Sequence, residues 1–112
     1  MSSRKGEVWL VNFGDPVGRE QAGGRPAVVV SANPLNESSA GVVIVVPTTT
    51  TYRNLPSHVE IEPGLSGLAD VSYAKCEDIK SVSEQRLVMR LGVIGNVAEF
   101  QVAHALRFLL DL

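Results

Sequence analysis

The chain has 112 residues, of which 45% are hydrophobic and 20% are charged, and a formal net charge of -2. This length suffices for one hydrophobic core but not for two, so we expect a single domain over residues 1–112. The net charge excludes a general nucleic-acid binder, because sequence-independent affinity for a polyanion requires many Lys and Arg side chains. Any site for nucleic acid must therefore be local.

The sequence also argues against a membrane or metal protein. No apolar stretch reaches the roughly 20 residues of a membrane span, and the polar residues after Met1 do not resemble a signal peptide. We therefore expect a soluble, cytoplasmic protein. Cys76 is the only cysteine, which excludes an intrachain disulfide and a cysteine-based metal site and favours a buried packing role. The acidic residues are scattered, so we expect no metal and no cofactor.

Short runs of β-branched residues alternate with turn residues at intervals of about 8 to 12 positions, which is typical of a mostly β protein. We predict strands over residues 6–13, 25–32, 41–46, 57–62, 70–76 and 88–93. In the first strand, Val8 and Leu10 should face one side of the sheet, and Trp9 and Val11 the other. Residues 33–40 have turn chemistry throughout and predict a loop.

Two of these strands are expected to differ in burial. The apolar run at residues 41–46 predicts a strand covered on both faces, by the barrel interior and by a helix or a partner subunit. Residues 57–62 alternate and predict a half-exposed strand that includes His58. His104 is expected on the polar side of a C-terminal helix. Both histidines are thus expected at the surface rather than as a catalytic pair.

The C-terminal part predicts helical structure. Ser81 and Glu84 have the spacing of a capping box before a short helical turn at residues 84–87. The one clear helix should begin at Asn96, an N-cap with Glu99 three residues later. Its apolar positions recur at helical spacing: Ala98, Val102, Ala105, Leu106, Leu109 and Leu112. Because this wide arc and the strand at 41–46 exceed what one small sheet covers, we predict a twofold dimer contact.

Together these elements predict a mainly β (α+β) fold, a small and strongly curved antiparallel sheet or barrel with a C-terminal amphipathic helix. One loop in it, at residues 18–26, is polar and rich in glycine and ends in Arg25 before an apolar strand. A guanidinium carries five donors in a planar fork and can make two parallel bonds to a phosphate, but it is a poor general base. We therefore assign to Arg25 the electrostatic stabilisation of a phosphate. Glu20 and Gln21 could bind base edges or orient Arg25.

The loop matches the pattern G-x-E-Q-x-G-x-R-P at Gly18, Glu20, Gln21, Gly23, Arg25 and Pro26. Pro47 and the threonines at 48–51 follow at the end of a later strand. With these motifs the chain resembles the MazF/PemK family of toxins, small ribonucleases that cut messenger RNA. The resemblance extends over nearly the whole chain and implies an SH3-like barrel that pairs as a homodimer.

The resemblance also implies a second catalytic residue, the threonine of a P-x-T pattern, which is Thr49 when Pro47 is the anchor. Adjacent side chains of a regular strand point to opposite faces, so Thr48 and Thr49 cannot both enter one pocket. We keep Thr48 as a substrate-binding candidate. A hydroxyl can donate to the oxygens of a phosphorane but is too weakly basic to act alone. In the family picture, Arg25 has an acid/base part as well.

Further substrate-binding candidates come from two segments. Tyr52 and Arg53 follow the threonines, where an aromatic face and a cation could hold an unstacked base. Ser72 and Asp78 belong to a segment that resembles the strand lining the RNA groove of the family. Many relatives carry glutamine at the position of Asp78, and this chain departs from them there.

The resemblance implies a metal-independent, sequence-specific endoribonuclease for single-stranded RNA, the toxin of a toxin-antitoxin pair. Its products would carry 2′,3′-cyclic phosphate and 5′-hydroxyl ends, and an acidic, extended antitoxin peptide would occupy the same groove. The alternative is a non-catalytic SH3-like barrel that binds a protein target such as gyrase. The pair Arg25 and Thr49 discriminates the two, because a pure binder has no reason to place them together.

Overall fold

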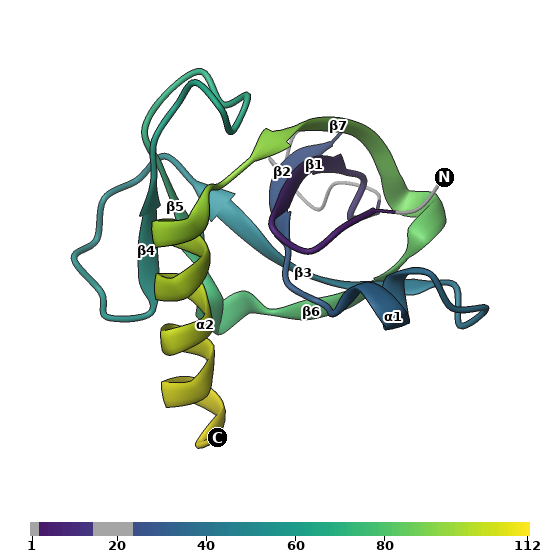
Figure 1. Ribbon diagram of the computed structural model, residues 1–112. Helices are drawn as coiled ribbons and strands as arrows, with labels where there is room; N and C mark the ends of the chain where they lie inside the picture. The colour runs from purple at the N-terminus through teal and green to yellow at the C-terminus, as the bar shows by residue number, and fades with distance from the viewer. Residues whose placement is uncertain (1–2, 15–23) are drawn as a thin grey trace.

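A strongly curved antiparallel sheet and one long helix make up the computed structural model, which describes residues 3–14 and 24–112 (Figure 1). The strands are β1 (Glu7–Val11), β2 (Arg25–Val29), β3 (Val42–Thr49), β4 (His58–Ile61), β5 (Ser72–Lys75), β6 (Lys80–Ser83) and β7 (Leu87–Val93). The helical elements are α1 (Asn33–Asn36), α2 (Asn96–Leu110) and the 3-10 turns η1 (Cys76–Asp78) and η2 (Glu84–Arg86). None of the helices in these ranges is long and apolar enough to cross a membrane.

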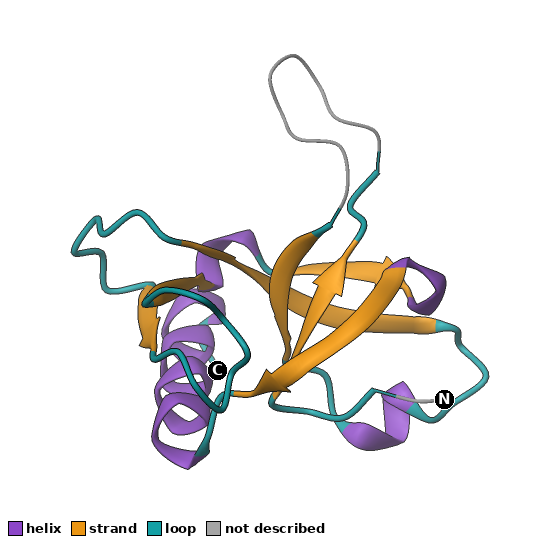
Figure 2. Ribbon diagram, turned by 90° about the horizontal axis from the view of Figure 1, so that it is seen from above, coloured by secondary structure: helices purple, strands orange, loops and turns teal. Residues whose placement is uncertain are grey.

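The sheet turns around β3, its longest strand. The strands lie in the order β4-β5-β3-β2-β1-β7, and β6 adds to β3 outside this path. The first half of β3 pairs with β6, whereas Thr48 and Thr49 pair with β5. Seen from above, the sheet therefore curls into a barrel with α2 beside it (Figure 2), where α2 packs against β4 and η1. The prediction of a mainly β barrel with a C-terminal helix is confirmed.

Two apolar clusters fill the two sides of the sheet. Val8, Val28 and Val46 belong to the cluster that includes Val102 and Ala105 of α2. The other cluster lies inside the barrel and consists of Trp9, Val11, Ala27, Val29, Val43, Val45 and Val82. The opposite orientation of Val8 and Trp9 is thus confirmed. The strand at 42–46 is largely covered within the chain itself, by the barrel interior and by α2, while Val42 and Ile44 are half-buried. Cover of this strand by a second copy stays a prediction.

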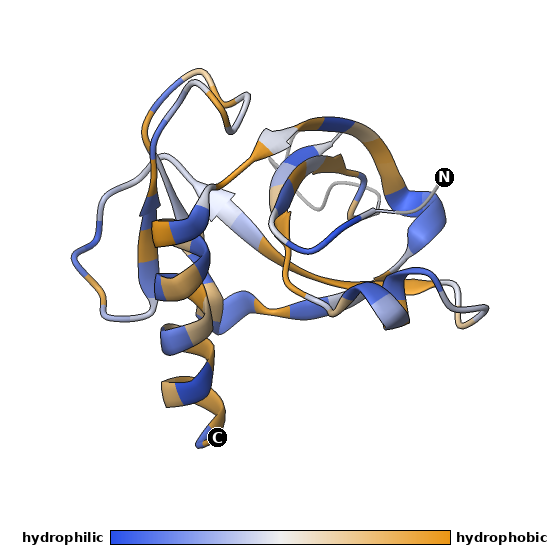
Figure 3. Cartoon of the chain, in the orientation of Figure 1, coloured by the Kyte–Doolittle hydropathy of each residue, from blue (hydrophilic) through white to orange (hydrophobic). Residues whose placement is uncertain are grey.

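Exposed apolar side chains lie instead on α2. Phe100 is 73% exposed and Phe108 is 72% exposed, and apolar and polar residues alternate along the outer side of this helix (Figure 3). Of the predicted apolar arc, Val102 and Ala105 are buried, while Leu112 is exposed. The helix is longer than the small β4–β5 part of the sheet can cover.

Residues 33–40, which we predicted to be a loop, contain α1. Pro34 lies in its first turn, where the missing N–H removes no helical hydrogen bond. Asn36 is buried, its Oδ1 accepts a hydrogen bond from the Ser31 hydroxyl, and its Nδ2 donates to the Ser31 carbonyl, 3.0 Å away. Ser31 in turn accepts from the backbone N–H of Ile44 at 3.0 Å. A polar contact between distant segments therefore stabilises a helix too short to show periodicity.

The sequence pattern also missed β6 and misplaced two helix caps. Only Val82 of β6 is buried, so its polar neighbours obscure the alternation. Ser83, not Ser81, caps η2 by accepting a hydrogen bond from the N–H of Gln85. Asn96 is the first residue of α2 and not its N-cap, which is Gly95 at φ 82°. Glycine adopts this left-handed backbone without strain, and it ends the turn that redirects the chain into the helix.

Glu7 joins β1 to β7 through a dense set of hydrogen bonds. Its Oε1 accepts from the Trp9 indole at 3.0 Å and from the Arg4 N–H at 2.7 Å, and its Oε2 accepts from Arg90 Nε at 2.7 Å. Burial raises the pKa of Glu7, but the hydrogen bonds from Trp9, Arg4 and Arg90 outweigh it and hold the pKa below the ordinary 4.5. Folding therefore favours the ionised carboxylate.

We expect Glu7→Gln to lower the free energy of unfolding by about 1 kcal/mol near pH 7, since Arg90 is half-exposed and solvent weakens its contribution. A lowered pKa stabilises the fold above the unfolded pKa, and this stabilisation disappears as the pH falls through the folded value. Urea unfolding of both proteins at pH 7 and at about pH 3 measures this. A stability difference as large at the acidic pH as at neutral pH would contradict the assignment.

Candidate functional site

Arg25 begins β2 at an open end of the barrel. It is exposed and pairs with Val11 of β1. A Cβ on the preceding Gly24 would lie 2.5 Å from Cγ of Leu10, so glycine allows the chain to pass close to β1 at this point. Of the loop residues singled out in the sequence, Glu20 and Gln21 lie outside the described residues.

The strand register brings Arg25 and Thr49 together. Ala27 of β2 pairs with Pro47 of β3, and Arg25 and Thr49, each two residues further along its strand, point to the same face as this pair. The position between them agrees, because the Thr48 hydroxyl donates to the carbonyl of Pro26 at 3.1 Å.

Thr48 points to the other side of the sheet. It is buried, and its hydroxyl is occupied by the Pro26 carbonyl. Thr49 is half-buried, and its Oγ1 accepts the N–H of Thr51 at 3.1 Å, which leaves the hydroxyl proton available to a ligand. Of the two threonines that sequence reasoning left open, Thr49 therefore shares a face with Arg25.

Tyr73 extends the row formed by Arg25 and Thr49, and sequence reasoning missed it. It pairs with Thr49 on one side and with Glu60 of β4 on the other. Its ring centroid lies 5.5 Å from that of Tyr52, which is 65% exposed. The sequence shows that Tyr73 is aromatic, but it does not show that Tyr73 lies next to Thr49. That position depends on the pairing of β5 with β3, which joins two residues 24 positions apart.

The remaining substrate-binding candidates are more dispersed. Arg53 is exposed in the loop after β3. Ser72 is buried, and its hydroxyl donates to the carbonyl of Asp70 at 3.1 Å. Asp78 lies in η1 and forms an ion pair with Lys75 at 2.9 Å. Thr48 and Ser72 are thus turned away from the face that carries Arg25, and Asp78 lies beyond the end of β5.

Two further cations, Lys80 and Arg86, are engaged by other groups of the protein. The Lys80 ammonium lies 4.9 Å from the centroid of the Phe13 ring, and Arg86 Nη1 donates to the carbonyl of Asn12 at 3.1 Å. Few cations are therefore available to a ligand at the site, which agrees with the chain's net charge of -2.

His58 is not the surface residue that the sequence predicted, because only 3% of its side chain is exposed. Its Nε2 lies 2.8 Å from Oε2 of Glu77, whose Oε1 accepts the Ser57 hydroxyl at 2.8 Å. Burial raises the pKa of Glu77, but the hydrogen bonds, that from His58 foremost, hold it below its ordinary value. Strand alternation cannot reveal such a partner 19 residues away. His104 is exposed, as predicted.

Cys76 begins η1 and is completely buried, which confirms its packing role. Burial, with a smaller contribution from the negative charge of Glu77, raises the pKa of its thiol to about 11. The thiolate needed for nucleophilic chemistry is therefore scarce at neutral pH.

The described residues thus place an exposed guanidinium, a hydroxyl and two tyrosine rings on one face of the sheet. A guanidinium and a hydroxyl on one face of a sheet can bind the non-bridging oxygens of one phosphate group. The rings beside them offer flat surfaces for an unstacked base.

Comparison with known proteins identifies relatives over almost the full length. The model of the family described as PemK-like, MazF-like toxin of type II toxin-antitoxin system matches residues 4–110. Endoribonuclease MazF9 of Mycobacterium tuberculosis is 33% identical over 114 residues, which cover 97% of each chain. Endoribonuclease MazF of Staphylococcus epidermidis is 30% identical over 110 residues, covering 97% of this chain and 92% of that protein.

Solved structures show the same fold. An endoribonuclease in complex with its cognate antitoxin from Mycobacterial species superposes with a TM-score of 0.83 at 25% identity, over 99% of this chain and 97% of that one. The MazE-MazF structure (Form-II) from Deinococcus radiodurans also has a TM-score of 0.83 and 25% identity, over 100% and 98% of the two chains.

Proposed function

We propose that this chain, which belongs to the PemK-like, MazF-like family of type II toxin-antitoxin toxins, is an endoribonuclease that cleaves single-stranded RNA at specific sequences. The observation that carries the proposal is the shared face of Arg25 and Thr49 at the exposed end of β2 and β3. Relatives named endoribonucleases support it.

In the proposed reaction, the 2′-hydroxyl of the substrate attacks the adjacent phosphorus in line with the departing 5′-oxygen. The O2′–P bond forms and the P–O5′ bond breaks, while the 2′-hydroxyl loses a proton and the 5′-oxygen gains one. The products carry a 2′,3′-cyclic phosphate and a 5′-hydroxyl. The substrate itself supplies the nucleophile, so this chemistry needs neither a metal ion nor a cofactor.

Arg25 and Thr49 would act on the phosphorane, which carries more negative charge than the starting diester. The Arg25 guanidinium would hold two of its oxygens through parallel charge-assisted bonds, and the Thr49 hydroxyl would donate to another. Tyr52 and Arg53 would bind the neighbouring nucleotides, and we assign the same general role to Glu20 and Gln21. Roles in substrate binding for Thr48, Ser72 and Asp78 stay predictions.

We further propose that the chain acts in the cytoplasm and binds a cognate antitoxin. Neighbouring structures contain an endoribonuclease with its antitoxin and a MazE-MazF complex. An acidic, extended antitoxin segment would bind the face that carries Arg25 and so compete with RNA for the same cations.

We expect a twofold dimer, because Val97, Phe100 and Phe108 expose apolar surface along α2. Exposure of this surface to water is unfavourable, and a second copy of the chain would bury it. Equilibrium sedimentation at micromolar concentration should give twice the chain mass of 12.0 kDa. Phe108→Glu should shift the equilibrium towards the single chain. A wild-type protein that sediments only as the single chain would contradict the dimer.

The experiment that tests the function is incubation of the protein with a long RNA in EDTA, followed by mapping of the ends. We expect discrete cuts with cyclic phosphate and 5′-hydroxyl termini. Intact RNA together with tight binding to a protein target such as gyrase would instead support the non-catalytic barrel. Cuts that appear only after magnesium is added would reject the proposed chemistry.

A further inference from the structure

A small pocket opens beside Thr49, on the side away from Arg25. It is lined by Tyr52, Asn54, Leu55, His58, Glu60 and Tyr73. Tyr73 is the direct partner of Thr49, and Glu60 is the partner of Tyr73 on the next strand. Neighbouring strands lie about 4.8 Å apart, so the pocket begins within about 5 to 10 Å of Thr49. That places it within reach of a nucleotide close to the phosphate bound by Arg25 and Thr49.

Two aromatic rings form one side of this pocket. The rings of Tyr52 and Tyr73 are 5.5 Å apart and inclined at 55°, so they meet as an open wedge and not as a closed stack. Tyr52 keeps 65% of its surface exposed. A large aromatic surface left open to water beside a phosphate-binding pair is suited to stacking on a base, and each stacked base typically contributes a five- to hundredfold gain in affinity.

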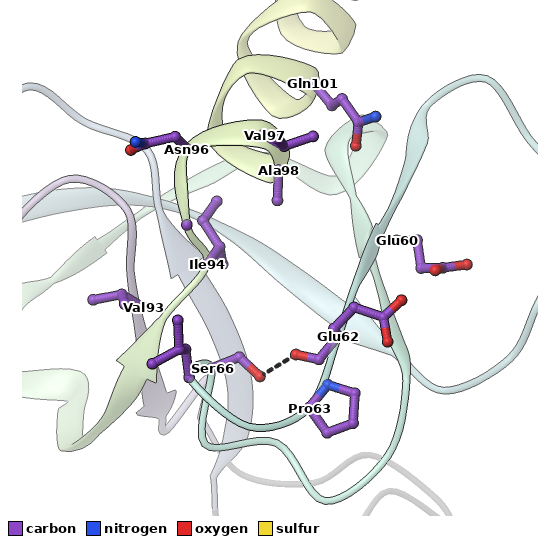
Figure 4. Close-up of a pocket in the computed structure, with 12 residues that line it drawn as sticks. Glu60, Glu62, Pro63, Ser66, Val93, Ile94, Asn96, Val97, Ala98 and Gln101 are labelled. Carbon is purple, nitrogen blue, oxygen red and sulfur yellow. Dashed lines mark hydrogen bonds between the residues drawn. The ribbon is translucent and has the colours of Figure 1, made fainter.

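Several side chains with polar atoms line the pocket, among them Asn54, His58 and Glu60, and the carboxylate of Glu60 is the acidic group. The side chain is exposed on β4, and in the view of the neighbouring hollow below α2 it projects away from the helix (Figure 4). An ionised carboxylate only accepts hydrogen bonds. Adenine, cytosine and guanine each present an exocyclic amino group, whereas uracil presents carbonyl oxygens at the corresponding positions and a single N–H.

The loop that carries Tyr52 is held by hydrogen bonds on both sides of that residue, the first from the N–H of Thr51 to Oγ1 of Thr49 at 3.1 Å. Asn54 adopts φ 51°, a left-handed conformation that asparagine tolerates better than most residues. The backbone N–H of His58 donates to the carbonyl of Leu55 at 3.0 Å, and the His58 ring is held by Glu77. The rings of Tyr52 and Tyr73 already lie 5.5 Å apart without a ligand, which limits the ordering cost of binding.

We propose that this pocket is a specificity site for one unstacked, amino-bearing RNA base, which Tyr52 and Tyr73 contact by stacking and whose amino group donates to Glu60. The inference rests on the proposed endoribonuclease function and adds to it the residues that select a base. Tyr73 and Glu60 are specificity-determining residues in this assignment, and they take no part in bond breaking.

The test compares Tyr73→Leu, Tyr73→Phe and Glu60→Gln with the wild type in cleavage of a long RNA and in binding of a short oligonucleotide. The oligonucleotide spans a mapped cut site and has deoxyribose at the attacking position. We expect Tyr73→Leu to lose about tenfold in affinity and Tyr73→Phe, which keeps the ring, to lose little. Glu60→Gln should accept uracil at one position of the cut site, because an amide can donate as well as accept.

Two controls make the result specific. Glu84→Gln removes the same charge from η2, outside the pocket, and should leave the cut-site preference unchanged. An oligonucleotide lacking the base at the selected position should bind wild type and Tyr73→Leu equally, because the stacking partner is gone. Thermal unfolding shows whether Tyr73→Leu is folded; if it is not, Glu60→Gln and Tyr52→Leu carry the test.

The outcomes separate this inference from the function on which it rests. A wild type that does not cut RNA rejects the function itself. Cleavage with unchanged preference in Glu60→Gln, and unchanged affinity in the folded tyrosine variants, rejects only the base pocket. The base pocket would also be rejected if the variants bound every oligonucleotide more weakly, whichever base it carried, and kept the cut-site preference of the wild type.

Discussion

Replacing Arg25 with alanine is expected to lower the rate of RNA cleavage by about a hundred- to a thousandfold, and Thr49→Ala should have an effect of similar size. Each substitution removes one preorganised donor from a transition state that gains negative charge, and such donors typically contribute this much. Both side chains lie at the open end of β2 and β3, so the free energy of unfolding should change by less than about 1 kcal/mol. Single-turnover cleavage of a mapped substrate, together with urea unfolding, measures both quantities.

Matched variants distinguish chemistry from general weakening. Thr49→Ser keeps the hydroxyl and should retain most of the activity. Arg4→Ala removes an exposed arginine that pairs with Glu37 away from the site, and cleavage should not change. If Thr48→Ala abolishes cleavage while Thr49→Ala does not, the assignment of Thr49 to the face of Arg25 is incorrect.

A single deoxyribose immediately 5′ of the scissile phosphate is expected to stop cleavage at that site while binding stays largely intact. The change removes the attacking 2′-hydroxyl, which is otherwise only a minor contact. Cleavage at other sites in the same RNA serves as the internal control. EDTA should have no effect on those cuts.

The same substrate tests how many cations take part. Affinity for the deoxy-substituted RNA should fall only moderately as salt rises, with a shallow slope, because Lys75, Lys80 and Arg86 are engaged within the protein and few charges reach the phosphates. Cutting that persists at the deoxyribose, or that requires magnesium, would indicate a hydrolytic nuclease and reject the roles of Arg25 and Thr49.

Local patterns in the sequence determined much of the fold. The opposite orientation of Val8 and Trp9 and the helical spacing of α2 reflect periods that the backbone imposes on its own side chains, whereas the continuous apolar run of β3 indicates a strand covered on both faces. These patterns identified the mainly β class with a C-terminal helix. They failed in α1 and β6, because α1 is a single four-residue turn held by the side-chain contact of Asn36 with Ser31, and because only Val82 of β6 is buried.

At the candidate site, too, the sequence identified some residues, and only the tertiary structure showed how they are arranged. Arg25 and the threonines could be recognised in the sequence, because the chemistry of a guanidinium or a hydroxyl belongs to the residue itself. Only the tertiary structure decided that Thr49, and not Thr48, shares a face with Arg25, and that Tyr73 and Glu60 continue the row. Strand register joins residues that lie far apart in the chain, and a shift of one residue would turn every one of these side chains to the other face.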